Sequence, residues 1–341
     1  MKFLRVIAVL LFILSGCQVD GTGLVLAPGW SYHSLGAWKH LAPNKMALSP
    51  DARWLYFSSE TSEYSTQARV AALNVNNGHT HVLVEGLRNA LGVHFAPDRS
   101  LWVAEGDDHG VIWRMSEPAH FPDEQRVNPT TRDTTDAGFT AFRFGGRFTH
   151  QAIAFSADKH FAYLADAAQN GSLYRLDLAA RKLTVLHRDQ GWLDVVPEEA
   201  VQMATRMHAA TFAAIADIEL LPDGTLLLAE SGTGQILKLD DRGSQPRLES
   251  WLKRDALRHP GDMSWDASRQ WLWITDTATP STLWAWDGQS LHEIMHHPLS
   301  RFSGVLAAAG KIFVNLQLGR NNPSMTFILK EHQVVENDTV Q

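Results

Sequence analysis

The chain has 341 residues, of which 45% are hydrophobic, and a formal net charge of −7 at pH 7. This acidic balance argues against nucleic acid as a partner, because duplex binding requires a basic surface. The length is ample for one domain with a large core, and the single cysteine, Cys17, excludes a disulfide within the chain.

The N-terminus has the pattern of a secretory signal peptide. Lys2 and Arg5 precede a short apolar run at residues 6–14, and small residues follow that run. The run is too short to span a bilayer, and no later segment reaches 18 uninterrupted apolar residues. The sequence therefore predicts that residues 1–16 are a cleaved signal and that the chain has no transmembrane helix.

The tetrapeptide Leu14-Ser15-Gly16-Cys17 resembles the lipobox of bacterial lipoproteins. In that family the chain is cut before the cysteine, which is then acylated. The resemblance implies a lipid anchor at Cys17, and Gln18 after it implies the outer membrane, facing the periplasm. An ordinary signal peptide is the alternative. Residues 17–23 would form the lipidated cysteine and a short tether, residues 24–336 one domain, and residues 337–341 a tail.

A unit of three strands recurs six times after this tether. Each unit has an apolar strand, a tight turn rich in Pro, Asp and Gly, a second strand, a polar loop and a third strand. The turn residues lie 47, 60, 65, 43 and 44 positions apart, and they are Asp51, Asp98, Asp158, Asp223, Asp266 and Gly310. A period in the forties with three or four strands per unit is typical of a β-propeller.

Fourth strands are legible in four of the units, at residues 80–84, 183–186, 248–252 and 291–294. Residues 24–38 precede the first unit and are strand-like, so we expect them to form the outer strand of the last blade and close the ring. The fold prediction is an all-β, six-bladed propeller. A count of five or seven would require one misread unit, and a β-sandwich would not show so regular a repeat.

Two long intervals between the turns indicate insertions, at about residues 117–148 and 188–215. The second contains Pro197 followed by Glu198 and Glu199, which is typical of a helix start. We expect this short helix to pack over one face of the disc. Most of the twelve Trp residues fall within strands, where packing between blades is their ordinary role.

A basic residue lies near the start of every predicted inner strand. If all six point to the same mouth of the channel, they form a positive rim that would concentrate a small anionic ligand. Lys45 is the first of them, and the candidate substrate-binding residues are Arg88, Arg147, Arg206, Arg258 and Arg301. The alternative is that loops simply expose arginine.

Carboxylates follow several of the predicted second strands. Glu105, Glu230 and Asp276 occupy equivalent positions in three units, and Asp262 enters an inner strand. These four are candidate metal ligands, since converging carboxylates suit Ca²⁺. The alternative is turn chemistry, in which such side chains bind nearby backbone. The sequence has no Gly-x-Ser-x-Gly, His-Glu-x-x-His or P-loop motif.

Several blocks, in order along the chain, resemble the PhoX-type alkaline phosphatase family. They are Leu26-Ala27-Pro28-Gly29-Trp30, residues 146–154 with the later Leu173-Tyr174-Arg175, Thr205-Arg206 with Ala216-Asp217-Ile218-Glu219, and Ile312-Phe313-Val314-Asn315-Leu316-Gln317. The resemblance implies a propeller phosphatase with iron and calcium in the channel. It also implies site roles for His150 and Asp217, which are the candidate catalytic residues.

The sequence departs from that family at its metal site. The family's iron site uses a cysteine, and here the only cysteine lies in the lipobox. Gln151 and Ala216 stand where the family has glutamate, and neither supplies an anionic ligand. We therefore expect that the iron and calcium chemistry is not intact.

Three functions remain open. The first is an envelope-anchored propeller that binds a ligand or a protein partner at the channel mouth, with its metal site lost. The second is a Ca²⁺-dependent hydrolase of phosphoesters. The third is a lactone hydrolase similar to the gluconolactonase and regucalcin propellers, which use one divalent ion. Propellers host many functions, so the fold does not decide among the three.

Overall fold

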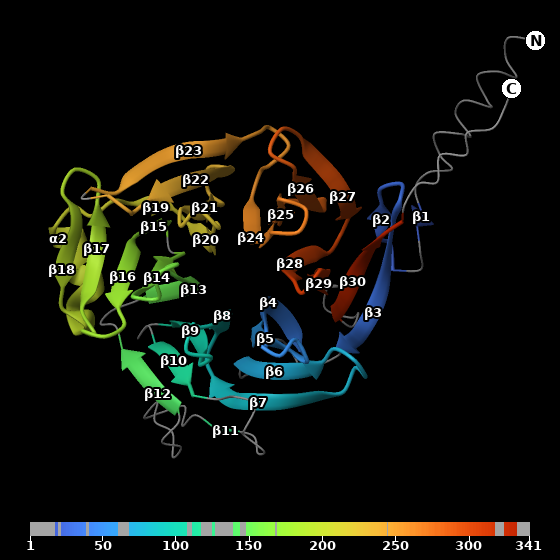
Figure 1. The fold of residues 1–341 in the computed structure, drawn as a ribbon, viewed down its shortest axis with the longest axis horizontal. Coiled ribbons are helices and arrows are strands. Elements are labelled where there is room, and N and C mark those ends of the chain that lie inside the picture. The colour runs from blue at the N-terminus through green and yellow to red at the C-terminus, as the bar shows by residue number, and fades with distance from the viewer. Residues whose placement is uncertain are drawn as a thin grey trace, which may run out of the picture.

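Antiparallel blades recur six times around a central axis, five of them with four strands and one with five (Figure 1). The computed structural model describes residues 18–19, 22–38, 41–60, 68–107, 111–116, 125–126, 139–143, 148–167, 169–243, 245–317 and 324–332. The predicted all-β, six-bladed propeller is confirmed. Among the described residues, no helix is long and apolar enough to cross a membrane.

In each of the first three blades the chain runs from the innermost strand to the outermost strand. Blade 1 comprises β4 (Ala42–Leu48), β5 (Trp54–Glu60), β6 (Ala68–Asn74) and β7 (Thr80–Leu87). Blade 2 comprises β8 (Ala90–Phe95), β9 (Leu101–Asp107), β10 (Val111–Met115) and β12 (Phe139–Arg143). Blade 3 comprises β13 (Phe148–Phe155), β14 (Phe161–Asp166), β16 (Leu173–Asp177), β17 (Leu183–His187) and a fifth strand, β18 (Gly191–Val195).

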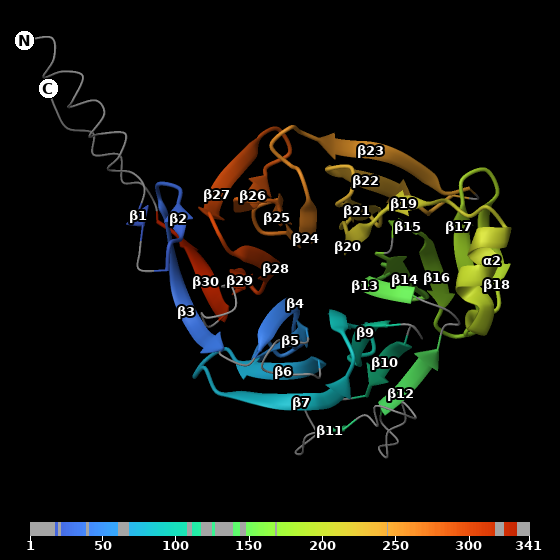
Figure 2. The ribbon, with the colours of Figure 1, turned by 180° about the vertical axis from the view of Figure 1, so that it is seen from behind.

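The remaining blades complete the circle, as the opposite view also shows (Figure 2). Blade 4 comprises β20 (Ile215–Leu220), β21 (Leu226–Glu230), β22 (Gln235–Asp240) and β23 (Arg247–Lys253). Blade 5 comprises β24 (Pro260–Asp266), β25 (Trp271–Asp276), β26 (Ser281–Trp286) and β27 (Leu291–His297). Blade 6 comprises β28 (Arg301–Ala308), β29 (Lys311–Gln317), β30 (Ser324–Glu331) and β3 (Trp30–Trp38).

The N-terminal strand closes the ring. β3 pairs antiparallel with β30, from Trp30 opposite Glu331 to Trp38 opposite Ser324. The predicted closure by residues 24–38 is thus confirmed. The residues before β3 add a contact that the sequence did not reveal, because β2 (Val25–Leu26) pairs with β27 of blade 5 and with β1 (Gln18–Val19).

The predicted turns have a local cause that repeats around the ring. In the first five blades, the Asp after the inner strand accepts a backbone N–H from the residue two positions later, at 2.9–3.2 Å. This is the Asx turn, which short acidic side chains form without help from distant residues. Blade 6 instead places Gly310 at φ +71°.

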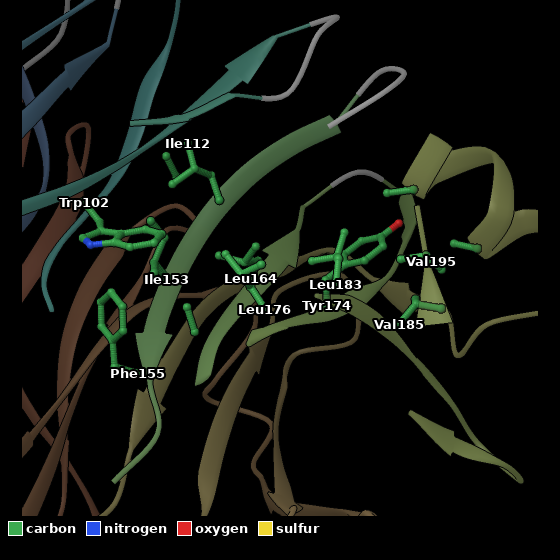
Figure 3. Packing of buried hydrophobic residues seen from close by; sticks show 14 of the residues in the cluster. Trp102, Ile112, Ile153, Phe155, Leu164, Tyr174, Leu176, Leu183, Val185 and Val195 are labelled. Carbon is green, nitrogen blue, oxygen red and sulfur yellow. The ribbon is translucent and has the colours of Figure 1, made fainter. Parts of the chain in front are cut away.

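Hydrophobic side chains fill the space between neighbouring blades. Six buried clusters are formed by the described residues, one for each blade-to-blade junction. Figure 3 shows the cluster of blades 2 and 3, where Trp102 and Phe155 face Ile153 and Leu164. Trp102, Trp113 and Trp273 are almost fully buried, which agrees with the expected role of tryptophan between blades.

Both predicted insertions contain structure. The second holds η2 (Pro197–Glu199) and α2 (Ala200–Arg206), so the short helix is confirmed. Its predicted position was wrong: Ala200 and Ala204 pack against the outer strands of blade 3, at the periphery rather than over a face (Figure 1). The first insertion supplies β12, the outer strand of blade 2, which the sequence pattern did not show. Shorter pairs complete these regions: β11 (Gln125–Arg126) with β7, and β15 (Gln169–Gly171) with β19 (Phe212–Ala213).

Candidate functional site

A β-bulge interrupts every inner strand near its start. In each of the six blades one extra residue enters the inner strand between two pairs that it makes with the second strand. A bulge changes which side chains face a given side of the sheet. In this ring it decides which residues of each inner strand face the channel.

The channel contains a small cavity that all six inner strands line. Its volume is about 50 Å³, and its lining includes Lys45, His94, Ile153, Asp217, Glu219, Asp262 and Val305. A polar cavity of this size holds water or one small polar group. Here blades distant in sequence bring ionisable side chains together on the axis.

Lys45 lines this cavity and lies between two carboxylates. Its Nζ donates to Oδ1 of Asp217 and, at 2.6 Å, to Oδ1 of Asp262. The three residues are 7%, 6% and 7% exposed, and they come from blades 1, 4 and 5. We call this group the channel triad.

The second oxygen of each carboxylate binds the next blade. Asp217 Oδ2 accepts the backbone N–H of Met263 at 2.8 Å, and Asp262 Oδ2 accepts that of Val305 at 2.8 Å. The two aspartates therefore connect inner strands that do not pair through their backbones. Each is held in place by the sheet that follows it.

Glu219 lies two residues after Asp217 on the same face of β20. Its Oε1 accepts the backbone N–H of Trp265 at 2.7 Å, which repeats the contact between Asp217 and blade 5. Ser264 continues the pattern, because its hydroxyl accepts the N–H of Ala307 from blade 6 at 2.9 Å.

Burial and neighbouring charge shift the pKa values of these groups. Burial alone would lower the pKa of Lys45, but Asp217 and Asp262 outweigh it and raise that pKa, so Lys45 carries its charge. Burial raises the pKa of Asp217 to about 7, although Lys45 opposes this shift. Burial also raises the pKa of Glu219 to about 8. At neutral pH the cavity thus holds an ammonium at Lys45 and a protonated carboxyl at Glu219.

The channel triad does not fit a divalent metal site. Within the part of the chain that the structure describes, no three His, Cys, Asp or Glu side chains are grouped to hold a metal. The oxygens of Asp217 and Asp262 that face each other are bound to the Lys45 ammonium, and their other oxygens are bound to backbone N–H groups. A Ca²⁺ ion needs six to eight oxygen ligands, so Asp262 serves the triad rather than the predicted calcium site.

The other three predicted ligands bind their own blades. Glu105 accepts the N–H of Arg88 at 2.5 Å, and Glu230 accepts that of Ala213 at 2.9 Å. Asp276 accepts the N–H groups of Arg258, His259 and Ala278 at 2.6, 3.1 and 2.9 Å. Each carboxylate thus caps the loop that leads into the inner strand of its own blade. The three carboxylates lie at equivalent positions in their blades, but each binds a nearby loop, and they do not converge on one site.

The predicted arginine rim is placed only in part. Arg88, Arg258 and Arg301 are exposed near the starts of their inner strands, and the Arg258 guanidinium donates to the Thr279 carbonyl at 3.0 Å. Arg206 was wrongly placed at the channel, because it ends α2 on the outer side of blade 3. The sixth basic residue, Lys45, lies inside the channel.

Some predicted residues lie outside what the structure describes. Arg147 and Cys17 are among them, and for His150 only the backbone is described, which pairs with Asp166. The roles of His150 as a catalytic residue and of Cys17 as a lipid anchor stay predictions.

Sequence reasoning missed the central role of Lys45 and did not select Glu219 or His94. The spacing Asp217-x-Glu219 in a strand places both carboxylates on one face, and that signal was available. No local pattern marks Lys45, because its partners are about 170 and 220 residues away.

A second cavity lies between blades 2 and 3, at the ends of the inner strands opposite to their starts. Its volume is about 520 Å³, and its lining includes Trp102, Phe142, Lys159 and Arg181. Trp102 stacks on Phe142 with ring centroids 5.1 Å apart. None of the predicted site residues whose side chains the structure describes lines this cavity.

No protein-family profile matches this sequence, and no curated protein does. Solved structures share its fold at low identity. A protein assigned as a gluconolactonase is 11% identical over 90% of this chain and 95% of its own, with a TM-score of 0.59. A gluconolactonase from Xanthomonas campestris is 15% identical over 93% of both chains, with a TM-score of 0.57. The PQQ-bound aldose sugar dehydrogenase of Streptomyces coelicolor is 13% identical over 89% and 99%, with a TM-score of 0.52. At these identities the likeness establishes the propeller fold alone.

Proposed function

We propose that this protein hydrolyses a sugar-derived lactone and that the channel triad is its reaction centre. The observation that carries the proposal is the charged Lys45 ammonium, held between two buried carboxylates in a cavity that all six blades line. Groups with strongly perturbed pKa values gather at functional sites. The gluconolactonases and the sugar dehydrogenase that share the fold make sugar-derived rings the favoured substrate class.

The triad offers what lactone hydrolysis requires. When water adds to the lactone carbonyl, the carbonyl oxygen gains negative charge, and a fixed ammonium in a poorly solvated site stabilises it. A carboxylate accepts the proton of the attacking water, and the pKa of Asp217 near 7 suits a base at neutral pH. The protonated carboxyl of Glu219 returns a proton to the ring oxygen as its bond to carbon breaks, which yields the hydroxy acid.

The size of the cavity sets where the substrate lies. About 50 Å³ admits one small polar group, such as a carbonyl group, but not a sugar ring. We therefore place the ring at the mouth where the inner strands begin, close to the exposed Arg88, Arg258 and Arg301. These arginines would bind the carboxylate of the product.

The test is hydrolysis of glucono-δ-lactone by the purified protein, followed as acid release above the spontaneous rate. We expect turnover that a chelator does not abolish and a loss of at least about 100-fold in Asp262→Asn, the scale of a removed electrostatic group. Arg206→Ala is the matched control, because that side chain lies on the outer edge of blade 3. No turnover of the lactone in folded wild-type protein would refute the proposal.

The same preparation tests the phosphoester alternative that the PhoX resemblance suggests. Hydrolysis of p-nitrophenyl phosphate, with and without Ca²⁺, would favour that alternative if it exceeded lactone turnover. The resemblance extends to Asp217 in the channel triad, but Lys45 occupies both of the facing carboxylates.

Binding without catalysis is the second candidate, because the triad satisfies its own charges and leaves little free volume. In that case a small anionic ligand would bind without turnover, which calorimetry with gluconate would detect.

For location, we propose an outer-membrane lipoprotein anchored at Cys17. Cys17→Ala should then release the protein from the membrane fraction, and membrane association unchanged by that substitution would contradict the anchor.

A further inference from the structure

We infer that Lys45 is the resident cation of the channel: its ammonium occupies a preformed two-carboxylate cation site and keeps one N–H for a ligand oxygen. The inference concerns the same site as the proposed function, but it assumes no reaction and is tested by stability and binding alone.

The two carboxylates are oriented before any cation is considered. Backbone N–H groups of Met263 and Val305, each 2.8 Å away, hold one oxygen of Asp217 and one of Asp262. The other oxygen of each carboxylate accepts a hydrogen bond from the same atom, Lys45 Nζ. Because these contacts come from neighbouring strands, the pair would keep its geometry if Lys45 were absent.

The charges require a cation at this point. Two buried carboxylates at hydrogen-bond distance from one atom repel each other strongly, and burial already raises the pKa of Asp217 to about 7. The Lys45 ammonium offsets this repulsion, and the two carboxylates raise its own pKa in return. A cation tied to the chain is present at a millimolar or higher effective concentration, so a dissolved cation competes poorly.

One donor of Lys45 remains available. An ammonium has three N–H groups, and two of them are directed to Asp217 and Asp262. In the residues that the structure describes, no further acceptor contacts Nζ, although the residue is only 7% exposed. A buried donor without an acceptor is costly, and the adjoining cavity of about 50 Å³ provides the space for a water or ligand oxygen.

The inference predicts chemical rescue. Lys45→Ala retains Cβ and removes the atoms of n-propylammonium, so that ion should fit the vacated space. We expect Lys45→Ala to unfold at a lower temperature than wild type, and about 10 mM n-propylammonium, the scale of a short tether, to restore most of the loss. Tetramethylammonium at equal ionic strength is the control, since it carries the same charge but has no N–H donor.

Two further experiments can refute the inference. Lys45→Ala/Asp262→Asn should lose the difference between the two ions, because half of the site is gone. Wild-type protein should bind no Ca²⁺ at about 1 mM in calorimetry, and this arm remains if Lys45→Ala does not fold. Ca²⁺ binding by wild type that Asp262→Asn abolishes would overturn the inference, as would equal effects of both ions on Lys45→Ala. If n-propylammonium rescues Lys45→Ala but the wild-type protein does not hydrolyse the lactone, only the proposed reaction is refuted.

Discussion

Gly304 holds blade 6 close to blade 1, and its replacement by alanine tests how tightly the ring closes around Lys45. A Cβ at this position would lie less than 3.0 Å from the carbonyl oxygen of Asn44, a separation that real Cβ atoms do not show. That carbonyl also accepts the Nδ2–H of Asn315 at 2.7 Å, and the preceding carbonyl, of Pro43, accepts the Ser303 hydroxyl at 2.6 Å. The clash is therefore with backbone that is already held in place.

The expected cost of Gly304→Ala follows from these contacts. Overpacking of this kind costs about 1–3 kcal/mol, and a broken buried hydrogen bond adds about 1–3 kcal/mol. Together these costs amount to about 2–6 kcal/mol, and at about 2–4 °C per kcal/mol the unfolding temperature should fall by roughly 4–24 °C. Because Asn44 directly precedes Lys45, its retreat should also move the ammonium away from Asp217 and Asp262.

Thermal unfolding measures the loss of stability. Gly243→Ala is the matched control: a Cβ there meets only Gln245, at an ordinary 3.6 Å, and its φ is not in the left-handed region. If Gly304→Ala were as stable as Gly243→Ala, the close approach of blades 6 and 1 would not constrain residue 304, which would refute the predicted clash.

Three more predictions address the carboxylates. Lys45→Met leaves Asp217 and Asp262 buried without their cation, so unfolding in urea should show a loss of about 3–5 kcal/mol at pH 7.5 and a smaller loss at pH 5.5, where Asp217 is protonated; equal losses would contradict the triad. Glu219 has a folded pKa of about 8, above its usual 4.5, so its contribution to stability is complete below pH 4.5 and is lost as pH rises through 8. Glu219→Gln should therefore flatten the decline of unfolding free energy across that window, and an unchanged slope would count against the raised pKa of Glu219. Asp276→Ala removes the acceptor of three backbone N–H groups and should cost about 1–3 kcal/mol without altering any cation binding; a lost metal affinity would instead restore its predicted role as a ligand.

The sequence by itself determined the blades, because their signals are local. Alternating apolar residues define strands, and a short acidic side chain such as Asp98 or Asp158 turns the chain by binding its own backbone. Repetition of this unit predicts a propeller, and a leftover strand before the first unit predicts closure by β3. Less regular segments, such as β12 in the first insertion, carry no such repeat and were missed.

Which side chains meet across the channel depends on the tertiary structure. Glu105 and Asp276 are residue types that bind metals. In the structure each lies beside the loop that enters its own blade and accepts a backbone N–H from that loop. Lys45 was expected at an exposed rim, but the bulge in β4 and the curvature of the ring direct it between Asp217 and Asp262. Contacts across the channel depend on bulges, where one residue changes the face of a side chain, and on the closing of six blades into a circle. Neither can be inferred from the local sequence pattern, so the strands were predictable and the channel triad was not.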